Sequence, residues 1–128
     1  MKILTIFLAI FLTINVFAQS EKNLTSAVQN YKKALNSGNP GLVESAIFHA
    51  AKFKLFFPER DTECLKKCLA KLAKNGENDT LSYKAYLANQ ILTQPNLFIN
   101  IEKKNYKDSQ AFFRMIAAEL QSQLLADK

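Results

Sequence analysis

Apolar residues recur at helical spacing along nearly all of the chain after residue 23, and the breaks fall at residues that favour turns. The one ambiguous stretch is residues 96–104, where apolar positions alternate as in a strand although the length suits two helical turns. We interpret this stretch as a short helix. The pattern predicts an all-α fold whose longer helices cover about residues 24–36, 40–57, 62–75, 79–94 and 109–125.

Each break carries residues that begin or end helices. Asn39 can cap the second helix with Pro40 in its first turn, and Pro58 prevents that helix from continuing. The glycine of Asn75-Gly76 is expected to adopt a left-handed conformation that stops the third helix. The remaining expected boundary residues are Ser37-Gly38, Asp61, Asn78 or Asp79, Pro95, and Asp108 or Ser109.

The same spacing predicts which face of each helix is buried. The last helix carries two apolar stripes and is therefore expected to pack between two neighbours. Its stripes are Ala111, Met115 and Ala118 on one side, and Phe113, Ala117, Leu120 and Leu124 on the other. The stripes of the first four helices are Leu24, Val28, Tyr31 and Leu35; Leu42, Ala46, Ala50, Phe53 and Phe57; Leu65, Cys68, Leu69 and Leu72; and Leu81, Ala85, Ala88 and Leu92.

An internal repeat relates three of these helices. When the helix after Asn39 is aligned with those after Asn78 and Asp108, four columns stay apolar in every copy. This recurrence predicts a stack of helical hairpins, in which each second helix covers its partner and the hairpins beside it. Chance matching between amphipathic helices is the alternative. The columns are Leu42, Leu81 and Ala111; Ala46, Ala85 and Met115; Ile47, Tyr86 and Ile116; and Phe48, Leu87 and Ala117.

Residues 37–46 resemble the turn and second-helix start of a HEAT-type repeat, in which an Asp/Asn-rich turn leads to an aliphatic residue and then alanine. Residues 75–85 have the same layout. The resemblance implies a short α-solenoid of stacked antiparallel hairpins, two full and one abbreviated, that acts as a non-catalytic protein-binding scaffold. The chain departs from the family at Val43, Ser82 and Phe112, where an arginine is common. The polar ladder that this arginine forms is missing, so the family's binding habits are not carried over.

The first residues have the layout of an export signal. The basic Lys2 precedes an apolar run too short for a stable membrane anchor, and Val16 and Ala18 place small side chains at a cleavage site. We expect a signal peptide over residues 1–18, a single helical domain over residues 19–128, and a periplasmic or extracellular location. A retained membrane anchor or a buried first helix is the alternative.

The chain is basic, with 17 Lys and Arg against 11 Asp and Glu and a formal net charge of +6. Loss of Lys2 with the signal would leave 16 against 11, or +5. No basic stripe interleaved with aromatic residues is present, so we expect no nucleic-acid partner. The charge instead favours solubility or peripheral contact with anionic lipid or envelope polymer. Lys67, Lys71 and Lys74 form a basic line on the third helix, either a solvated face or such a contact.

Candidate catalytic and metal-ligating residues are few. Cys64 and Cys68 share an apolar helix face, which predicts buried thiols; a strained or intermolecular disulfide and a metal or redox role are the alternatives. His49 is the only histidine, and the sequence near it does not supply the combination of a nucleophile and an orienting carboxylate that a catalytic triad would require. Together with both cysteines it would make only three zinc ligands. We expect no metal site, no cofactor and no enzymatic activity.

Tyr83 and Tyr86 project away from the inward stripe of the fourth helix. They form either an exposed aromatic contact patch or the second packing face that stacking requires, and we favour packing. The candidate partner-binding residues are Tyr83, Tyr86, Lys67, Lys71 and Lys74. The predicted function is an exported module that binds a protein partner or, alternatively, anionic membrane or envelope polymer. Self-association is also expected, because the array lacks obvious polar terminal caps.

Overall fold

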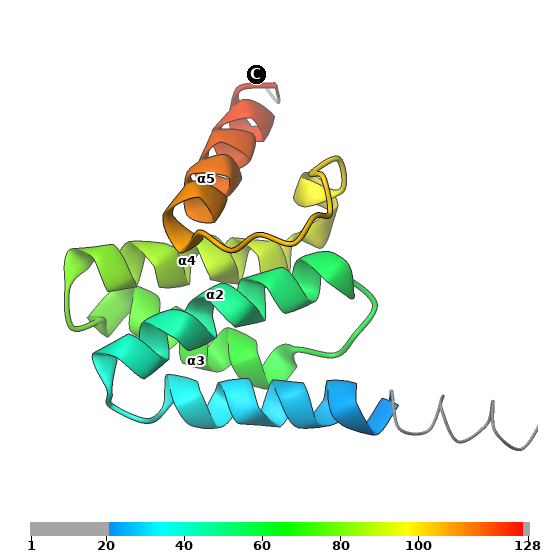
Figure 1. Ribbon diagram of the computed structural model, residues 1–128. Helices are drawn as coiled ribbons and strands as arrows, with labels where there is room; N and C mark the ends of the chain where they lie inside the picture. The colour runs from blue at the N-terminus through cyan, green and yellow to red at the C-terminus, as the bar shows by residue number, and fades with distance from the viewer. Residues whose placement is uncertain (1–20, 127–128) are drawn as a thin grey trace, which may run out of the picture. The chain divides into compact units, whose positions relative to one another are not determined.

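The computed structural model describes residues 21–126, and the regular structure in this range is entirely helical (Figure 1). The chain divides into two units, with the boundary between residues 30 and 31. In the first unit residues 21–30 are described; they are helical, and their helix continues to residue 35. The predicted signal peptide lies outside the described residues. None of the helices between residues 21 and 126 combines the length and apolar content that crossing a membrane requires.

The second unit contains four further α-helices and one 3₁₀ helix. They are α2 (Pro40–Phe56), α3 (Glu63–Asn75), α4 (Asp79–Thr93), η1 (Pro95–Phe98) and α5 (Ser109–Ala126). The predicted all-α class is confirmed, and these helices lie close to their predicted positions. The ambiguous stretch is helical only in its first part, because residues 99–108 that follow η1 form no regular structure beyond a turn and a bend.

Asparagine caps begin α2 and α4 as predicted. The Asn39 side chain accepts a hydrogen bond from the backbone N–H of Leu42 at 3.2 Å, and Asn78 does the same for Leu81 at 2.9 Å. The prediction for α3 was one residue early. Its cap residue is Thr62, which makes no capping hydrogen bond through its side chain.

The two predicted glycine stops behave differently. Gly38, predicted to end the first helix, has φ of +74°, the left-handed conformation that favours glycine. Gly76 has φ of −62° and ψ of 153°, which is extended backbone, so the left-handed prediction was wrong there. Glycine is required here because neighbouring backbone leaves no room for a side chain. A Cβ at Gly76 would lie 2.7 Å from the carbonyl oxygen of Leu72 and 3.0 Å from the backbone nitrogen of Ser82.

Gly76→Ala is therefore expected to destabilise the protein by about 1–3 kcal/mol, because the hairpin backbone must shift to admit the methyl group. Gly41→Ala is the matched control, since the nearest atom to a Cβ there is a side-chain oxygen of Asn39 at 3.6 Å. Urea denaturation of both variants measures the difference. Equal stabilities would show that the turn after α3 relaxes freely.

α4 is the central helix of the second unit, in contact with α2, α3, η1 and α5. α3 and α4 are joined by residues 76–78 and pack together as a helical hairpin. The predicted inward stripe of α4 is confirmed, because all its members are buried: Leu81, Ala85, Ala88 and Leu92.

α2 is buried around most of its circumference, because it packs against α4 and η1 and meets the aromatic side chains of α5. The predicted single stripe was too narrow, since Ile47, Phe48 and Leu55 are buried as well. It was wrong at its two ends, where Leu42 is 48% exposed and Phe57 is also exposed. Leu42 lies in the first turn and Phe57 follows the last turn, and a side chain at a helix end has fewer neighbours to cover it.

An aromatic cluster attaches α5 to α2. The ring of Phe112 lies 5.3 Å from that of Phe48, 5.3 Å from that of Tyr106 and 5.2 Å from that of Phe113, measured between centroids. Only the contact with Phe48 joins elements far apart in sequence, because Tyr106 lies in the loop just before α5 and Phe113 is the next residue of α5. The interplanar angles are 61–77°, the edge-to-face geometry that aromatic pairs favour.

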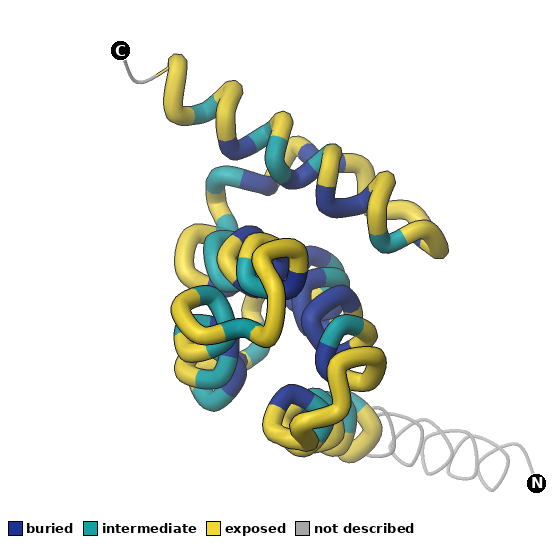
Figure 2. Tube along the Cα trace, turned by 90° about the vertical axis from the view of Figure 1, so that its left-hand side faces the viewer, coloured by how far each residue is buried: buried dark blue, intermediate teal, exposed yellow. Residues whose placement is uncertain are grey.

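The first predicted stripe of α5 was wrong, whereas the second was correct except at Leu124, because Phe113 and Leu120 are buried and Ala117 is half-buried. One face is buried, comprising Phe112, Phe113, Ile116 and Leu120. Ala111, Ala118 and Leu124 are exposed, because α5 has neighbours on one side instead of two. Figure 2 shows α5 as the upper helix, with mostly exposed residues in its final turns.

The repeat columns differ in burial from copy to copy. The column of Ala46, Ala85 and Met115 is buried or half-buried throughout. In the column of Ile47, Tyr86 and Ile116, however, the tyrosine is exposed. α2 packs on α4, whereas α5 contacts η1 more than it contacts α4.

Candidate functional site: a groove between α4 and α5

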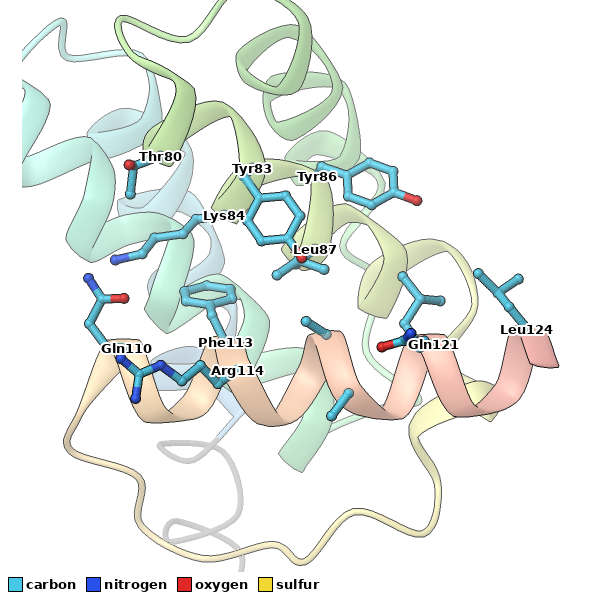
Figure 3. Close-up of a pocket in the computed structure, with 13 residues that line it drawn as sticks. Thr80, Tyr83, Lys84, Tyr86, Leu87, Gln110, Phe113, Arg114, Gln121 and Leu124 are labelled. Atoms are coloured by element: carbon cyan, nitrogen blue, oxygen red, sulfur yellow. The ribbon is translucent and has the colours of Figure 1, made fainter. Parts of the chain in front are cut away.

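An open groove of about 590 Å³ lies between α4 and α5. α5 touches α4 over only a small area, and its aromatic residues also contact Phe48 of α2. The middle of the groove is apolar, with Leu87 of α4 facing Phe113 of α5 below Tyr83 (Figure 3). The volume lies within the range of sites that bind ligands or side chains of a partner.

The two ends of the groove differ in chemistry. Lys84, Gln110 and Arg114 gather at one end, whereas Tyr86 and Leu124 lie toward the other (Figure 3). Leu124 is 57% exposed, so this end presents a large apolar side chain to solvent. The groove can therefore hold an apolar surface along its length and a polar or anionic group at one end.

Lys84 is the polar residue that the sequence analysis missed. It is 3% exposed, and its Nζ lies 2.6 Å from Oε1 of Glu44 on α2 and 3.4 Å from Oγ of Ser109 on α5. The same ammonium lies 5.8 Å from the centre of the Phe113 ring. Helical spacing contained a signal for this residue, because it falls three positions after Leu81 and four before Ala88 on the inward stripe. Lys84 links three helices at the end of the groove.

Tyr83 and Tyr86 both line the groove and are exposed, by 55% and 43%. The preferred interpretation, that these tyrosines form a second packing face, was therefore wrong. Their exposure agrees with the alternative of an exposed aromatic patch. They remain exposed because α5 does not close over this side of α4 as a stacked third repeat would.

The lysine line of α3 is a separate surface. Lys67, Lys71 and Lys74 are exposed, as predicted for a solvated face, and none of them lines the groove. None of the three makes an ion pair with another described residue. The five predicted partner-binding residues thus belong to two surfaces, one aromatic and one basic.

The two cysteines are free thiols and are half-buried, so the prediction of fully buried thiols was only partly correct. Both line a shallow hollow beside Lys32 and Lys67, and the Cys68 sulfur lies 3.5 Å from the side-chain nitrogen of Asn36. Within residues 21–126 no group of three or more His, Cys, Asp and Glu side chains is placed to hold a metal ion. His49 does not approach the thiols closely enough to change this.

His49 is exposed and lies against aromatic rings. Its ring lies 6.2 Å from that of Tyr31, nearly parallel, and 5.4 Å from that of Phe48. Partial burial, and then the positive charge of Lys52, lower the pKa of the imidazole below its ordinary value of about 6.5.

Since the folded pKa is lower than the unfolded one, protonation favours the unfolded chain. Stability is therefore expected to fall as the pH drops below about 6.5 and to level off below the folded pKa of His49. His49→Gln should remove this component, which is measured by comparing urea denaturation of both proteins at pH 7.5 and 5. An NMR titration that places the His49 pKa at or above 6.5 would contradict the expectation.

No protein-family model, curated protein or solved structure matches this chain. The resemblance to HEAT-type repeats therefore stands on the sequence motifs, and the groove is interpreted from its own geometry.

Proposed function

We propose that this chain is an exported, non-catalytic helical module that binds another protein through the groove between α4 and α5. The observation that carries the proposal is the pair of exposed tyrosines, Tyr83 and Tyr86, beside an apolar groove of about 590 Å³. Tyrosine and arginine dominate the binding energy of many protein interfaces, and Arg114 lies at the same groove. Export is proposed on the pattern of residues 1–18.

The chemistry of the groove supports binding rather than catalysis. Its walls contain apolar, aromatic, amide, hydroxyl and cationic side chains, but no histidine, cysteine or carboxylate. General acid–base or nucleophilic catalysis usually relies on such groups. The proposal also retains the HEAT-like layout for α2, α3 and α4, supported by the α3–α4 hairpin and the packing of α2 on α4.

Site-specific photo-crosslinking in the native host tests the proposal. Tyr86→p-benzoylphenylalanine places the probe at the groove, and Phe57→p-benzoylphenylalanine is the matched control, because Phe57 is similarly exposed but does not line the groove. We expect a discrete protein adduct at position 86 that is absent at position 57 and is lost when Tyr83→Ala is added. No adduct at position 86, or the same adducts at both positions, would refute the proposal.

A second candidate function is contact with anionic lipid or envelope polymer through α3. It is supported by the exposure of Lys67, Lys71 and Lys74 without ion pairs among the described residues. Co-sedimentation with vesicles of neutral lipid, with and without anionic lipid, tests it. We expect binding that requires anionic lipid, weakens with added salt and is lost when all three lysines are changed to glutamine. Binding that is unaffected by lipid charge, by salt and by these substitutions would refute this function.

A further inference from the structure

We propose that the groove holds one face of an amphipathic helix that carries a carboxylate at the end seated against Arg114. This inference rests on the proposed function and specifies the chemistry of its partner. Three features of the groove lead to it: its length, its charge and the identity of its apolar anchors.

The α5 side of the groove is long enough for several turns of a helix, and the α4 side lines it from Thr80 to Leu87. Its α5 wall extends from Gln110 to Leu124, which corresponds to about 21 Å at 1.5 Å per residue. An amphipathic helix that lies in such a groove contributes anchors at helical spacing, about three or four along one face. Leu87, Phe113 and Leu120 provide the apolar wall that these anchors would contact, and Tyr83 and Tyr86 stand beside it.

The charge of the groove is unbalanced toward positive. No carboxylate lines it, whereas Lys84 and Arg114 both do. The Lys84 ammonium is already paired with Glu44, so it is not the free group. Arg114 is exposed and has no ion pair with another described residue. An acidic side chain of the partner would complement Arg114.

A second copy of this chain is a less favourable occupant. The apolar face of its most clearly amphipathic helix, α3, is already covered, because Leu65 and Leu69 are buried and α3 packs against α4. Two copies of a chain with a net charge of +6 also repel each other. An acidic helix from a different protein avoids this repulsion and complements the basic chain as a whole.

Fluorescence anisotropy with synthetic helical peptides tests the inference. The probe is a labelled peptide of about 16 residues with leucines along one face and one glutamate, placed at either end of that face. Matched peptides carry glutamine or lysine in place of the glutamate. We expect the better glutamate peptide to bind about two- to fivefold more tightly than its glutamine counterpart, and the lysine peptide to bind least.

Arg114→Gln should abolish the preference for glutamate over glutamine, whereas Lys71→Gln, which removes one charge outside the groove, should preserve it. Tyr83→Ala and Tyr86→Ala together should weaken binding of every peptide. Equal binding of the glutamate and glutamine peptides by the wild-type protein would overturn the inference. Two further results would overturn it. One is displacement of the labelled peptide by a single-chain anionic detergent at a lower concentration than unlabelled peptide, which would indicate a lipid-like occupant. The other is a dimer that must dissociate before the peptide binds, which would indicate a second copy of this chain.

Failure of this inference can be distinguished from failure of the proposed function. If Tyr86 crosslinks a protein in the native host but no acidic peptide binds preferentially, the module binds a partner of other chemistry and only the inference fails. If neither crosslinking nor peptide binding occurs, the proposed function fails with it.

Discussion

Phe112→Ala is expected to lower the free energy of unfolding by about 3–5 kcal/mol, the largest effect of any single truncation considered for this protein. The Phe112 side chain is fully buried and contacts the rings of Phe48, Tyr106 and Phe113. Alanine would leave a cavity where α2, α5 and the preceding loop meet. Because a domain of this size is stable by about 5–15 kcal/mol, the loss would be a large part of the total.

Urea denaturation followed by circular dichroism measures this effect. Leu125→Ala is the control on the same helix, since Leu125 is exposed and its truncation should change stability by no more than about 0.5 kcal/mol. Phe112→Ala should also weaken peptide binding, because the aromatic cluster around Phe112 positions the α5 wall of the groove. A loss below about 1 kcal/mol for Phe112→Ala would show that α5 is not held by this cluster.

Glu44→Ala is expected to destabilise the protein by about 3 kcal/mol, more than removal of its partner Lys84. The reason is the unequal burial of the two side chains, 4% exposed for Lys84 and 47% for Glu44. Without Glu44 the buried ammonium keeps only the Ser109 hydroxyl and the nearby Phe113 ring. Without Lys84 the carboxylate is still reached by water, so Lys84→Met, which retains the apolar stem, should cost no more than about 1 kcal/mol.

The two single variants and the double variant form a thermodynamic cycle, again measured by urea denaturation. Adding Lys84→Met to Glu44→Ala should restore most of the lost stability, because it removes the unpaired buried charge. A larger loss for Lys84→Met than for Glu44→Ala would contradict the prediction and would assign the main role to the lysine stem.

The helix boundaries were predictable from the sequence because the interactions that set them are local. Asn39 and Asn78 each satisfy a backbone N–H three residues ahead, and both contacts form. Proline ends α4 in the same local way. At Gly76 the local argument failed, because the requirement comes from the close approach of Ser82 in the next helix.

The choice of buried face was less predictable. The stripe of α4 was correct, because α4 has neighbours along its inward face. Apolar periodicity could not show that α5 would be covered on one side only, and so it misplaced Ala111 and Leu124. For the same reason it favoured packing for Tyr83 and Tyr86, which the position of α5 leaves exposed.

By itself the sequence determined an all-helical chain, the approximate limits of its helices and two of their caps, because hydrogen bonds and spacing within a few residues decide these. Only the tertiary structure decided that Glu44, Lys84 and Ser109 meet, and that the aromatic cluster holds α5 so that a groove opens beside α4. These contacts join residues separated by 25 or more positions. Their formation depends on how whole helices pack, which local periodicity does not specify.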